Sequence, residues 1–237
     1  MAGCTTCWCG SQESSTVFVA DTYRLLRCKE RGTYLIHPPP VKNNESCAQF
    51  YSQYYSDCPK HVTTEGCGSR FWQVLEKEPW LRSELARGMI VDIGCGDGHL
   101  CAELYQAGYT NVCGIDVAQP RIAMARTRYP FIAFYDVPLE ESGLLPASAH
   151  VAIMDNVVEH LPDPQSLLAQ CMAIIEEGGY IVLITPNMKS GCFRLLGRRW
   201  TPELAPHAHI FLFCGESLVK LLQTVPKCRA VKVGSFH

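Results

Sequence analysis

The chain has 237 residues, a formal net charge of −2 and a pI near 6.4. This length accommodates one α/β domain of ordinary size with an extension. The balanced charge and the lack of a Lys/Arg run argue against nucleic acid or an anionic membrane as a partner. The sequence contains no run of about 18 apolar residues, so we expect a cytoplasmic protein without a membrane partner.

Fourteen cysteines are spread unevenly along the chain, and seven of them lie within the first 67 residues. Because no export signal is apparent, we expect thiols or metal ligands rather than disulfides. The other seven occur in apolar segments, where cysteine behaves as a small hydrophobe.

Residues 1–68 differ in composition from the rest and are predicted to form a Cys-rich, aromatic extension. An amphipathic helix is expected within Arg70–Leu85, at the start of a second domain that spans residues 69–237.

Short apolar runs alternate with helical patterns from about Met89 onward, which is typical of βα units and a mostly parallel sheet. Helices are expected after residue 98 and at Pro120–Arg128, Pro164–Ile175 and Glu216–Gln223. Strands are expected at Met89–Ile93, Asn111–Ile115, Phe131–Tyr135, Val151–Met154, Tyr180–Ile184 and Ala230–Val233. The predicted fold is α/β, a doubly wound sheet with helices on both faces.

A glycine-rich turn, Asp92-Ile93-Gly94-Cys95-Gly96-Asp97-Gly98, follows the first of these strands. Glycines permit a tight turn and let the backbone approach a ligand closely. Asp116 ends the next strand, where a carboxylate can accept hydrogen bonds from both hydroxyls of a ribose. The alternative is an ordinary turn in which Asp97 caps the following helix.

The glycine spacing separates two classes of cofactor. The dinucleotide fingerprint reads G-x-G-x-x-G, whereas this turn reads G-x-G-x-G with Asp92 two positions before it. A carboxylate there suits a cationic ligand such as the ammonium of S-adenosylmethionine and suits a pyrophosphate poorly. A nicotinamide-dependent dehydrogenase is therefore disfavoured.

The ordered segments VDIGCGDGHL, GIDVA, DNVVEHLPDP and GGYIVLITPN resemble the motifs of class I S-adenosylmethionine-dependent methyltransferases. The resemblance covers Met89–Val233 and implies a Rossmann-like fold that binds this cofactor. The residues that it places at the cofactor are Asp92, Gly94, Cys95, Gly96, Gly98, Asp116, Val117, Asp136, Val137, Asp155 and Asn156. The family core ends in a pair of strands, of which only the first is recognisable here.

The N-terminal cysteines resemble the zinc ribbon that precedes some bacterial methyltransferases of sugar and natural-product pathways. Cys4, Cys7 and Cys28 are the expected zinc ligands. Arg31 stands where the fourth cysteine is expected, so Cys47 or His37 would have to replace it. The alternative is a set of reduced thiols without metal.

A hydroxyl acceptor must lose a proton during methyl transfer. Four side chains on segments expected at the carboxyl ends of the strands are candidate bases: Glu159, His160, His207 and His209. His207 and His209 could share one face of an extended segment, and we favour this pair, whereas His160 can instead bind a turn.

Aromatic side chains are the candidates for the acceptor pocket, with packing in the core as the alternative. They are Tyr51, Tyr54, Tyr55 and Trp200.

The predicted function is methylation of a small-molecule acceptor, chiefly O-methylation of a sugar, a natural product or a lipid-linked metabolite. A thiol or arsenic methyltransferase is a variant that the cysteines permit. A protein that binds S-adenosylmethionine without catalysis and works with a partner enzyme is the alternative, and a homodimer is also left open. A zinc-ribbon nucleic-acid module is disfavoured by the acidic pI.

Overall fold

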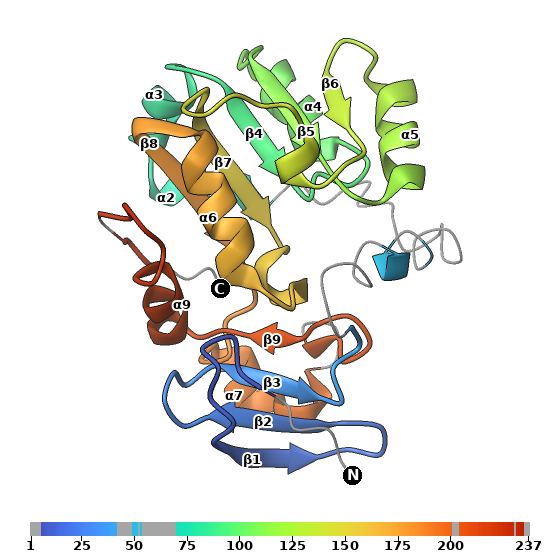
Figure 1. Ribbon diagram of the computed structural model, residues 1–237, viewed down its shortest axis with the longest axis vertical. Coiled ribbons are helices and arrows are strands. Elements are labelled where there is room, and N and C mark those ends of the chain that lie inside the picture. The colour runs from blue at the N-terminus through green and yellow to red at the C-terminus, as the bar shows by residue number, and fades with distance from the viewer. Residues whose placement is uncertain are drawn as a thin grey trace. The chain divides into compact units, whose positions relative to one another are not determined.

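The computed structural model describes residues 6–41, 49–51, 53, 70–200, 204–229 and 231–234. The chain forms two compact units, and each is assembled from separate stretches of sequence (Figure 1). We call them the antiparallel-sheet unit (residues 1–47, 158–168 and 185–237) and the parallel-sheet unit (residues 48–157 and 169–184). The predicted division between residues 68 and 69 stays a prediction.

The parallel-sheet unit is built on five parallel strands in the order β6-β5-β4-β7-β8. Their bounds are β4 Ile90–Ile93, β5 Val112–Ile115, β6 Ala133–Tyr135, β7 Ala149–Asp155 and β8 Ile175–Ile184. All residues of β4 and β5 are buried, as expected for central strands covered on both faces. Helices flank this sheet (Figure 1), and the Rossmann-like fold is confirmed.

The helices of this unit are α2 Arg70–Lys77, α3 Leu81–Leu85, α4 His99–Gln106 and α5 Gln119–Arg128, with the 3₁₀ turn η2 at Leu139–Glu141. A further helix, α6 Pro164–Ile174, begins in the antiparallel-sheet unit and ends in the parallel-sheet unit. The helix expected within Arg70–Leu85 is two helices. Pro79 separates them, because proline has no N–H for the helical ladder and its ring clashes with the preceding turn.

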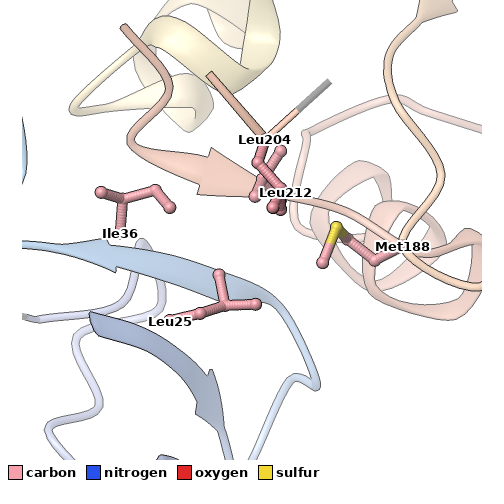
Figure 2. Packing of buried hydrophobic residues seen from close by; sticks show 5 residues of the cluster. All are labelled: Leu25, Ile36, Met188, Leu204 and Leu212. Carbon is pink, nitrogen blue, oxygen red and sulfur yellow. The ribbon is translucent and has the colours of Figure 1, made fainter. Parts of the chain in front are cut away.

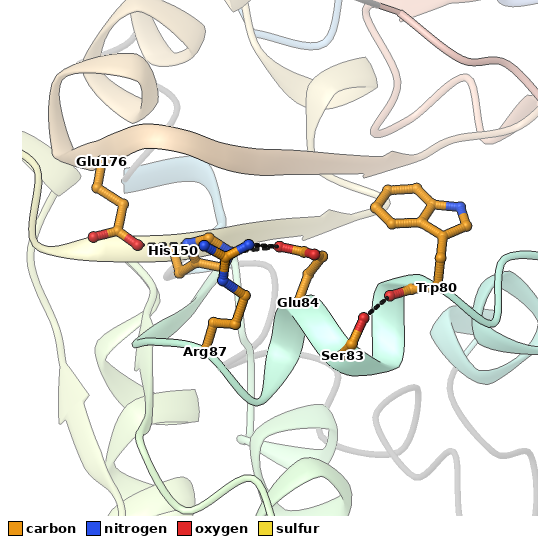
Figure 3. Close-up of polar contacts among 6 residues, drawn as sticks. All are labelled: Trp80, Ser83, Glu84, Arg87, His150 and Glu176. Atoms are coloured by element: carbon orange, nitrogen blue, oxygen red, sulfur yellow. Dashed lines mark hydrogen bonds and ion pairs between the residues drawn. The ribbon is translucent and has the colours of Figure 1, made fainter.

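A buried histidine links α3 to the sheet. His150 on β7 is 1% exposed, and its ring contacts Glu84 of α3 and Glu176 of β8 (Figure 3). Glu84 also pairs with Arg87 over 3.2 Å. These contacts give the ring nitrogens of His150 polar partners inside the core, as buried polar groups require.

The antiparallel-sheet unit contains four strands in the order β1-β2-β3-β9, an arrangement that the sequence did not predict. The strands are β1 Ser14–Val19, β2 Arg24–Cys28, β3 Tyr34–His37 and β9 Phe211–Leu212. The unit also contains η3 Val158–His160, α7 Gly191–Leu196, η4 Gly197–Arg199 and α9 Gly215–Leu222.

The core of this unit joins residues from both ends of the sequence. Leu25 and Ile36 from β2 and β3 pack with three side chains from beyond residue 184 (Figure 2). Those three are Met188, Leu204 and Leu212, and all five are no more than 1% exposed. The N-terminal segment is thus an integral part of this unit.

The strand expected at Ala230–Val233 is wrong for the part of it that the structure describes. Residues 231–234 have no regular structure, and Val233 is 45% exposed. The physical reason is that a strand requires a hydrogen-bonded neighbour, and none of the described ladders includes this segment. Among the described residues, no helix has the length and hydropathy needed to cross a bilayer.

Candidate functional site

The glycine turn lies between β4 and α4. Gly94, Gly96 and Gly98 have φ values of 75°, 55° and 78°, the left-handed region that favours glycine. The amides of Gly94 and Cys95 both donate to the carbonyl of Ile115, over 2.8 and 3.1 Å. The turn is therefore fixed against the end of β5.

Steric crowding also requires glycine in this turn. A Cβ at Gly94 would lie 2.5 Å from Cγ2 of Val157, and one at Gly98 would lie 2.5 Å from Cζ of Phe134. Both distances are shorter than any normal contact, so larger residues would displace their neighbours. The sequence shows the turn, but only the structure shows what packs against it.

Asp116 follows β5 and holds the two adjacent turns. Its Oδ2 accepts a hydrogen bond from the amide of Gly96 over 2.8 Å, and its Oδ1 accepts one from Ala118 over 2.7 Å. Burial raises the pKa of Asp116, although these N–H donors oppose the rise. Its place at the carboxyl end of β5 suits the predicted contact with a ribose.

Asp97 does not cap α4, contrary to the alternative reading of the turn. Gly98 is the N-cap residue and makes no side-chain cap. Asp97 instead forms ion pairs with Arg121 over 3.3 Å and with Arg128 over 2.9 Å. Both arginines come from α5, so the carboxylate joins the glycine turn to that helix, a role that the local sequence could not indicate.

Three carboxyl groups gather at the carboxyl ends of neighbouring strands. Burial, with smaller contributions from the nearby charges of Asp155 and Asp116, raises the pKa of Asp92 to about 8. Asp92 is only 3% exposed, and its Oδ2 accepts a weak hydrogen bond from the thiol of Cys101 over 3.5 Å. This end of the sheet is consequently a site at which a cation would relieve unfavourable electrostatics.

Asn156 has a left-handed backbone at φ 55°, which asparagine tolerates better than most residues. Its Nδ2 donates to Asp155 over 2.9 Å, and its Oδ1 accepts from Arg70 over 2.9 Å. The amide of Asn156 also donates to the carbonyl of Ile184 over 2.8 Å. Arg70 is thus a residue near the predicted site that the motifs did not include.

Asp136 follows β6 and already has a charged partner. Arg126 of α5 donates to its Oδ1 over 2.8 Å, and this hydrogen bond lowers the pKa of Asp136. Val117 and Val137, which follow β5 and β6, are half-buried, and Cys95 is buried. All of the predicted cofactor residues therefore belong to the parallel-sheet unit.

These residues fit S-adenosylmethionine. The turn offers backbone without side chains at Gly94, Gly96 and Gly98, and the neighbouring carboxyl groups suit a ligand that carries a sulfonium and an ammonium. This fit is inferred from the left-handed conformations of the glycines and from the raised pKa of Asp92, which shows that its negative charge is unfavourable without a cation.

The candidate base residues belong to the antiparallel-sheet unit, where Glu159 is fully buried in η3. Its Oε2 accepts a hydrogen bond from the hydroxyl of Thr185 over 2.9 Å, and its Oε1 lies 3.9 Å from Nε2 of His209. The backbone carbonyl of Glu159 accepts from Ile210 over 2.9 Å. Glu159 and His209 therefore form a buried acid–histidine pair.

His207 and His209 do not share one face of an extended segment, so that expectation is wrong. Residues 206–208 form a turn in which the amides of Ala208 and His209 both donate to the carbonyl of Ala205 over 2.8 Å. The turn leaves His207 exposed, whereas His209 is 6% exposed and contacts Glu159. The two histidines thus differ in environment.

His160 is held mainly by local contacts. Its Nδ1 lies 3.2 Å from the carbonyl oxygen of Ala208, and its ring packs edge-on against that of His209 at 4.6 Å. Burial, with a smaller contribution from the charge of His207, lowers the pKa of His160 to about 4. His160 is accordingly neutral at physiological pH, which favours the turn-binding reading.

The predicted pocket aromatics fall in different places. Tyr51 is buried and belongs to the parallel-sheet unit, where its ring packs against Phe50 at 5.0 Å. Trp200 lies in the other unit, against Phe193 and the Leu25 core. Tyr54 and Tyr55 lie outside the described residues.

Two of the three predicted zinc ligands are described, and they meet a third cysteine. Cys7, Cys28 and Cys9 place their Sγ atoms within 4.8 Å of one another, and Cys9 was not among the predicted ligands. Cys4 and the substitute ligand Cys47 lie outside the described residues. His37, the other substitute, lies at the end of β3.

Comparisons with known proteins identify relatives of this chain. Curated relatives include the ubiquinone biosynthesis O-methyltransferases of Bordetella avium, 31% identical over 133 residues, and of Pseudomonas aeruginosa, 30% identical over 132 residues. Each alignment covers 53% of this chain, and 55% and 56% of the respective relative. The chain thus matches about half the length of these relatives.

Solved structures support the fold. The 1,6-didemethyltoxoflavin-N1-methyltransferase of Burkholderia thailandensis matches with a TM-score of 0.57 and 19% identity, over 89% of this chain and 87% of that one. The magnesium protoporphyrin IX methyltransferase of Synechocystis PCC 6803 also has a TM-score of 0.57, with 16% identity over 77% and 88%. Both structures hold S-adenosylhomocysteine or SAH, the cofactor product.

A family model described as a methyltransferase domain matches residues 73–225, which is more than half of the chain. This range contains the glycine turn, Asp116 and the carboxyl cluster of Asp92 and Asp155, the features that carried the resemblance. The chain belongs to the class I S-adenosylmethionine-dependent methyltransferases.

Proposed function

We propose that this chain transfers a methyl group from S-adenosylmethionine to a hydroxyl oxygen of a small-molecule acceptor. The observation that carries the proposal is the gathering of Asp92, Asp116 and Asp155 beside a turn of left-handed glycines. Such a site favours a cationic ligand that approaches the backbone closely.

The cofactor supplies an already activated methyl group, so the protein needs chiefly to bind, orient and exclude water. In our proposal Asp116 binds the ribose hydroxyls, and Asp136 lies near the adenine amine. Asp92 and Asp155 offset the positive charge of the ligand.

Deprotonation of the acceptor is assigned to His209. A neutral imidazole can accept the hydroxyl proton, and the carboxylate of Glu159 can stabilise the imidazolium that forms. The assignment is supported by the 3.9 Å distance between Oε1 of Glu159 and Nε2 of His209. His160 is a weaker candidate, because its low pKa makes it a poor proton acceptor near neutral pH.

The names of the curated relatives favour a hydroxyl acceptor related to ubiquinone precursors over a sugar. Among the predicted acceptors, we therefore favour lipid-linked metabolites. The alternative is cofactor binding without catalysis. A structural neighbour titled as the [4+2]-cyclase SpnF, with a TM-score of 0.56 and 14% identity, indicates that this fold is not confined to methyl transfer. In that protein the same fold carries a different named chemistry.

The decisive experiment has two stages. Calorimetric titration with S-adenosylmethionine, S-adenosylhomocysteine and NAD should show binding of the first two and not of NAD. Transfer of a labelled methyl group to hydroxyl-bearing ubiquinone precursors, natural-product phenols and sugars then identifies the acceptor class. Cofactor binding with no transfer to any hydroxyl acceptor would support the non-catalytic alternative, and absence of cofactor binding would reject both.

A further inference from the structure

The first turn of the antiparallel-sheet unit brings cysteines together before β1. Cys7 is 4% exposed and Cys9 is partly exposed. The amide of Gly10, whose φ is 83°, donates to the carbonyl of Cys7 over 2.8 Å. The chain thus turns sharply around the Cys7 and Cys9 side chains.

A second turn that contains a left-handed glycine follows β2. Cys28 ends that strand and is 2% exposed, and the amide of Gly32, at φ 75°, donates to its carbonyl over 2.9 Å. The amide of Arg31 also points at the Cys28 sulfur, with N and Sγ 3.4 Å apart. An amide directed at sulfur stabilises a thiolate, which is the form that binds metals.

The two turns face each other and are held together by neighbouring side chains. Trp8, which lies between Cys7 and Cys9, donates its indole N–H to the hydroxyl of buried Thr33 over 2.9 Å. The guanidinium of Arg31 stacks over the Trp8 ring at 5.6 Å. Arg31 stands where the expected pattern has its fourth cysteine, and its contact with Trp8 connects the two turns.

The spacing of the sulfur atoms decides between a disulfide and a metal. The Sγ atoms of Cys9 and Cys28 are 3.9 Å apart, whereas a disulfide requires about 2.0 Å. Zinc–sulfur bonds of about 2.3 Å give a tetrahedral edge of about 3.8 Å between neighbouring sulfurs. The Sγ atoms of the three cysteines, which come from two turns, all lie within 4.8 Å of one another. Cysteines that pack only as small hydrophobes need not bring their sulfur atoms together in this way.

We propose that Cys7, Cys9 and Cys28 are thiolate ligands of one zinc ion. This set differs from the one that the sequence predicted, since it includes Cys9. Three thiolates leave one position of a tetrahedral ion for a further ligand, which the described residues do not identify. The proposal does not rest on the proposed methyl transfer, because none of these three cysteines belongs to the predicted cofactor site or is a candidate base.

The ion would connect the segment before β1 to the end of β2. Ser14 of β1 already pairs with Cys28, and β2 pairs with β3, which in turn pairs with β9. Zinc bound there stabilises the sheet whose last strand begins two residues after His209.

The test begins with the full chain, purified in reductant without a chelator and analysed for metal by mass spectrometry. One zinc per chain is expected, either as purified or after titration with zinc and removal of the excess. Replacement by cobalt should produce thiolate-to-cobalt charge-transfer absorption in the near ultraviolet. A chain that retains no zinc after titration overturns the proposal.

Single serine variants then identify the ligands. Cys7→Ser, Cys9→Ser and Cys28→Ser should each weaken zinc binding at least tenfold and reduce the cobalt band. Cys228→Ser, with exposure similar to that of Cys9, and Cys192→Ser, which is exposed, serve as controls that keep wild-type affinity. If Cys9→Ser binds zinc as tightly as the controls do, the assigned ligand set is wrong.

A further measurement covers variants that fail to fold. In the wild-type protein, zinc should protect three thiols from a thiol reagent, and a chelator should expose them. Peptide mapping of the labelled protein must find Cys7, Cys9 and Cys28 among the protected sites, and protection of other cysteines alone would reject the assignment. Calorimetry with S-adenosylmethionine on the same samples reports separately on the cofactor site.

Discussion

The amide of Gly96 donates a 2.8 Å hydrogen bond to the carboxylate of Asp116 and so joins the glycine turn after β4 to the end of β5. This contact makes Asp116 both a structural acceptor and the proposed ribose ligand. Replacement by asparagine keeps the size of the side chain but removes its charge. We expect Asp116→Asn to weaken S-adenosylmethionine binding at least tenfold, as measured by calorimetry.

The matched control for that variant is Glu141→Gln, an exposed carboxylate in the same unit. It should bind the cofactor like the wild type. Circular dichroism of both variants checks that the fold is retained. Equal affinities for Asp116→Asn and the control would remove Asp116 from the cofactor site.

The pKa of Asp92 predicts a pH dependence of stability. The folded chain retains this proton up to about pH 8, whereas the unfolded chain releases it near the ordinary value of 3.8. Between these values the folded state binds more protons, so the free energy of unfolding should fall as the pH rises. Asp92→Asn should show a smaller decline between pH 5 and pH 8 in urea denaturation, with Glu141→Gln as the control.

A cationic ligand favours the ionised form of Asp92. At pH 7, therefore, binding of S-adenosylmethionine should release protons. Calorimetry in two buffers with different ionisation enthalpies measures this release, and Asp92→Asn should lose it. The prediction fails if the apparent binding enthalpies of the wild type and the variant depend equally on the buffer.

Gly98 tests the steric argument for the glycine turn. Gly98→Ala introduces both an unfavourable left-handed backbone and a Cβ 2.5 Å from Phe134. Gly143→Ala, at a similar φ of 73° with no atom within 4 Å, introduces only the backbone cost. We expect about 1–2 kcal/mol of destabilisation for Gly143→Ala and about 1–3 kcal/mol more for Gly98→Ala.

Chemical denaturation of the two variants measures this difference directly. Each is compared with the wild type at the same pH and without ligand. Similar losses for the two variants would mean that Phe134 relaxes away from the new methyl group and that sterics do not determine the glycine at this position.

Variants of His209 and His207 test whether His209 is the catalytic base. His209→Gln should reduce the methyl-transfer rate at saturating acceptor by about 100-fold, the lower range for loss of a general base. His207→Gln alters an exposed side chain and should keep most of the activity. Both variants should bind S-adenosylmethionine with wild-type affinity, and an unchanged rate in His209→Gln would reject its assignment as the base.

Much of the parallel-sheet unit could be predicted because its signals are local. The apolar run of β4, the glycine turn and Asp116 lie within residues 90–116, and β4, β5 and β7 are followed by the helices α4, α5 and α6. The break at Pro79 was also visible in the sequence, although the periodicity on both sides of it suggested one helix.

The antiparallel sheet could not be predicted in this way. Its strand β3 pairs Tyr34 with Leu212, and no local pattern indicates a partner so distant in sequence. The separation of His207 from His209 has a similar cause, since a turn at Ala205 rotates the segment and directs only His209 toward Glu159. Such contacts depend on tertiary structure rather than on residue spacing.

The pairing of β3 with β9 also constrains the order of folding. Leu25 and Ile36 are synthesised before residues 48–157, whereas Met188 and Leu212, which pack against them, are synthesised afterwards. Until then the first three strands expose an apolar face, the kind of surface that chaperones recognise. The N-terminal strands must therefore complete their sheet after translation of the parallel-sheet unit, and a release of the chain before Leu212 would leave that sheet without its last strand.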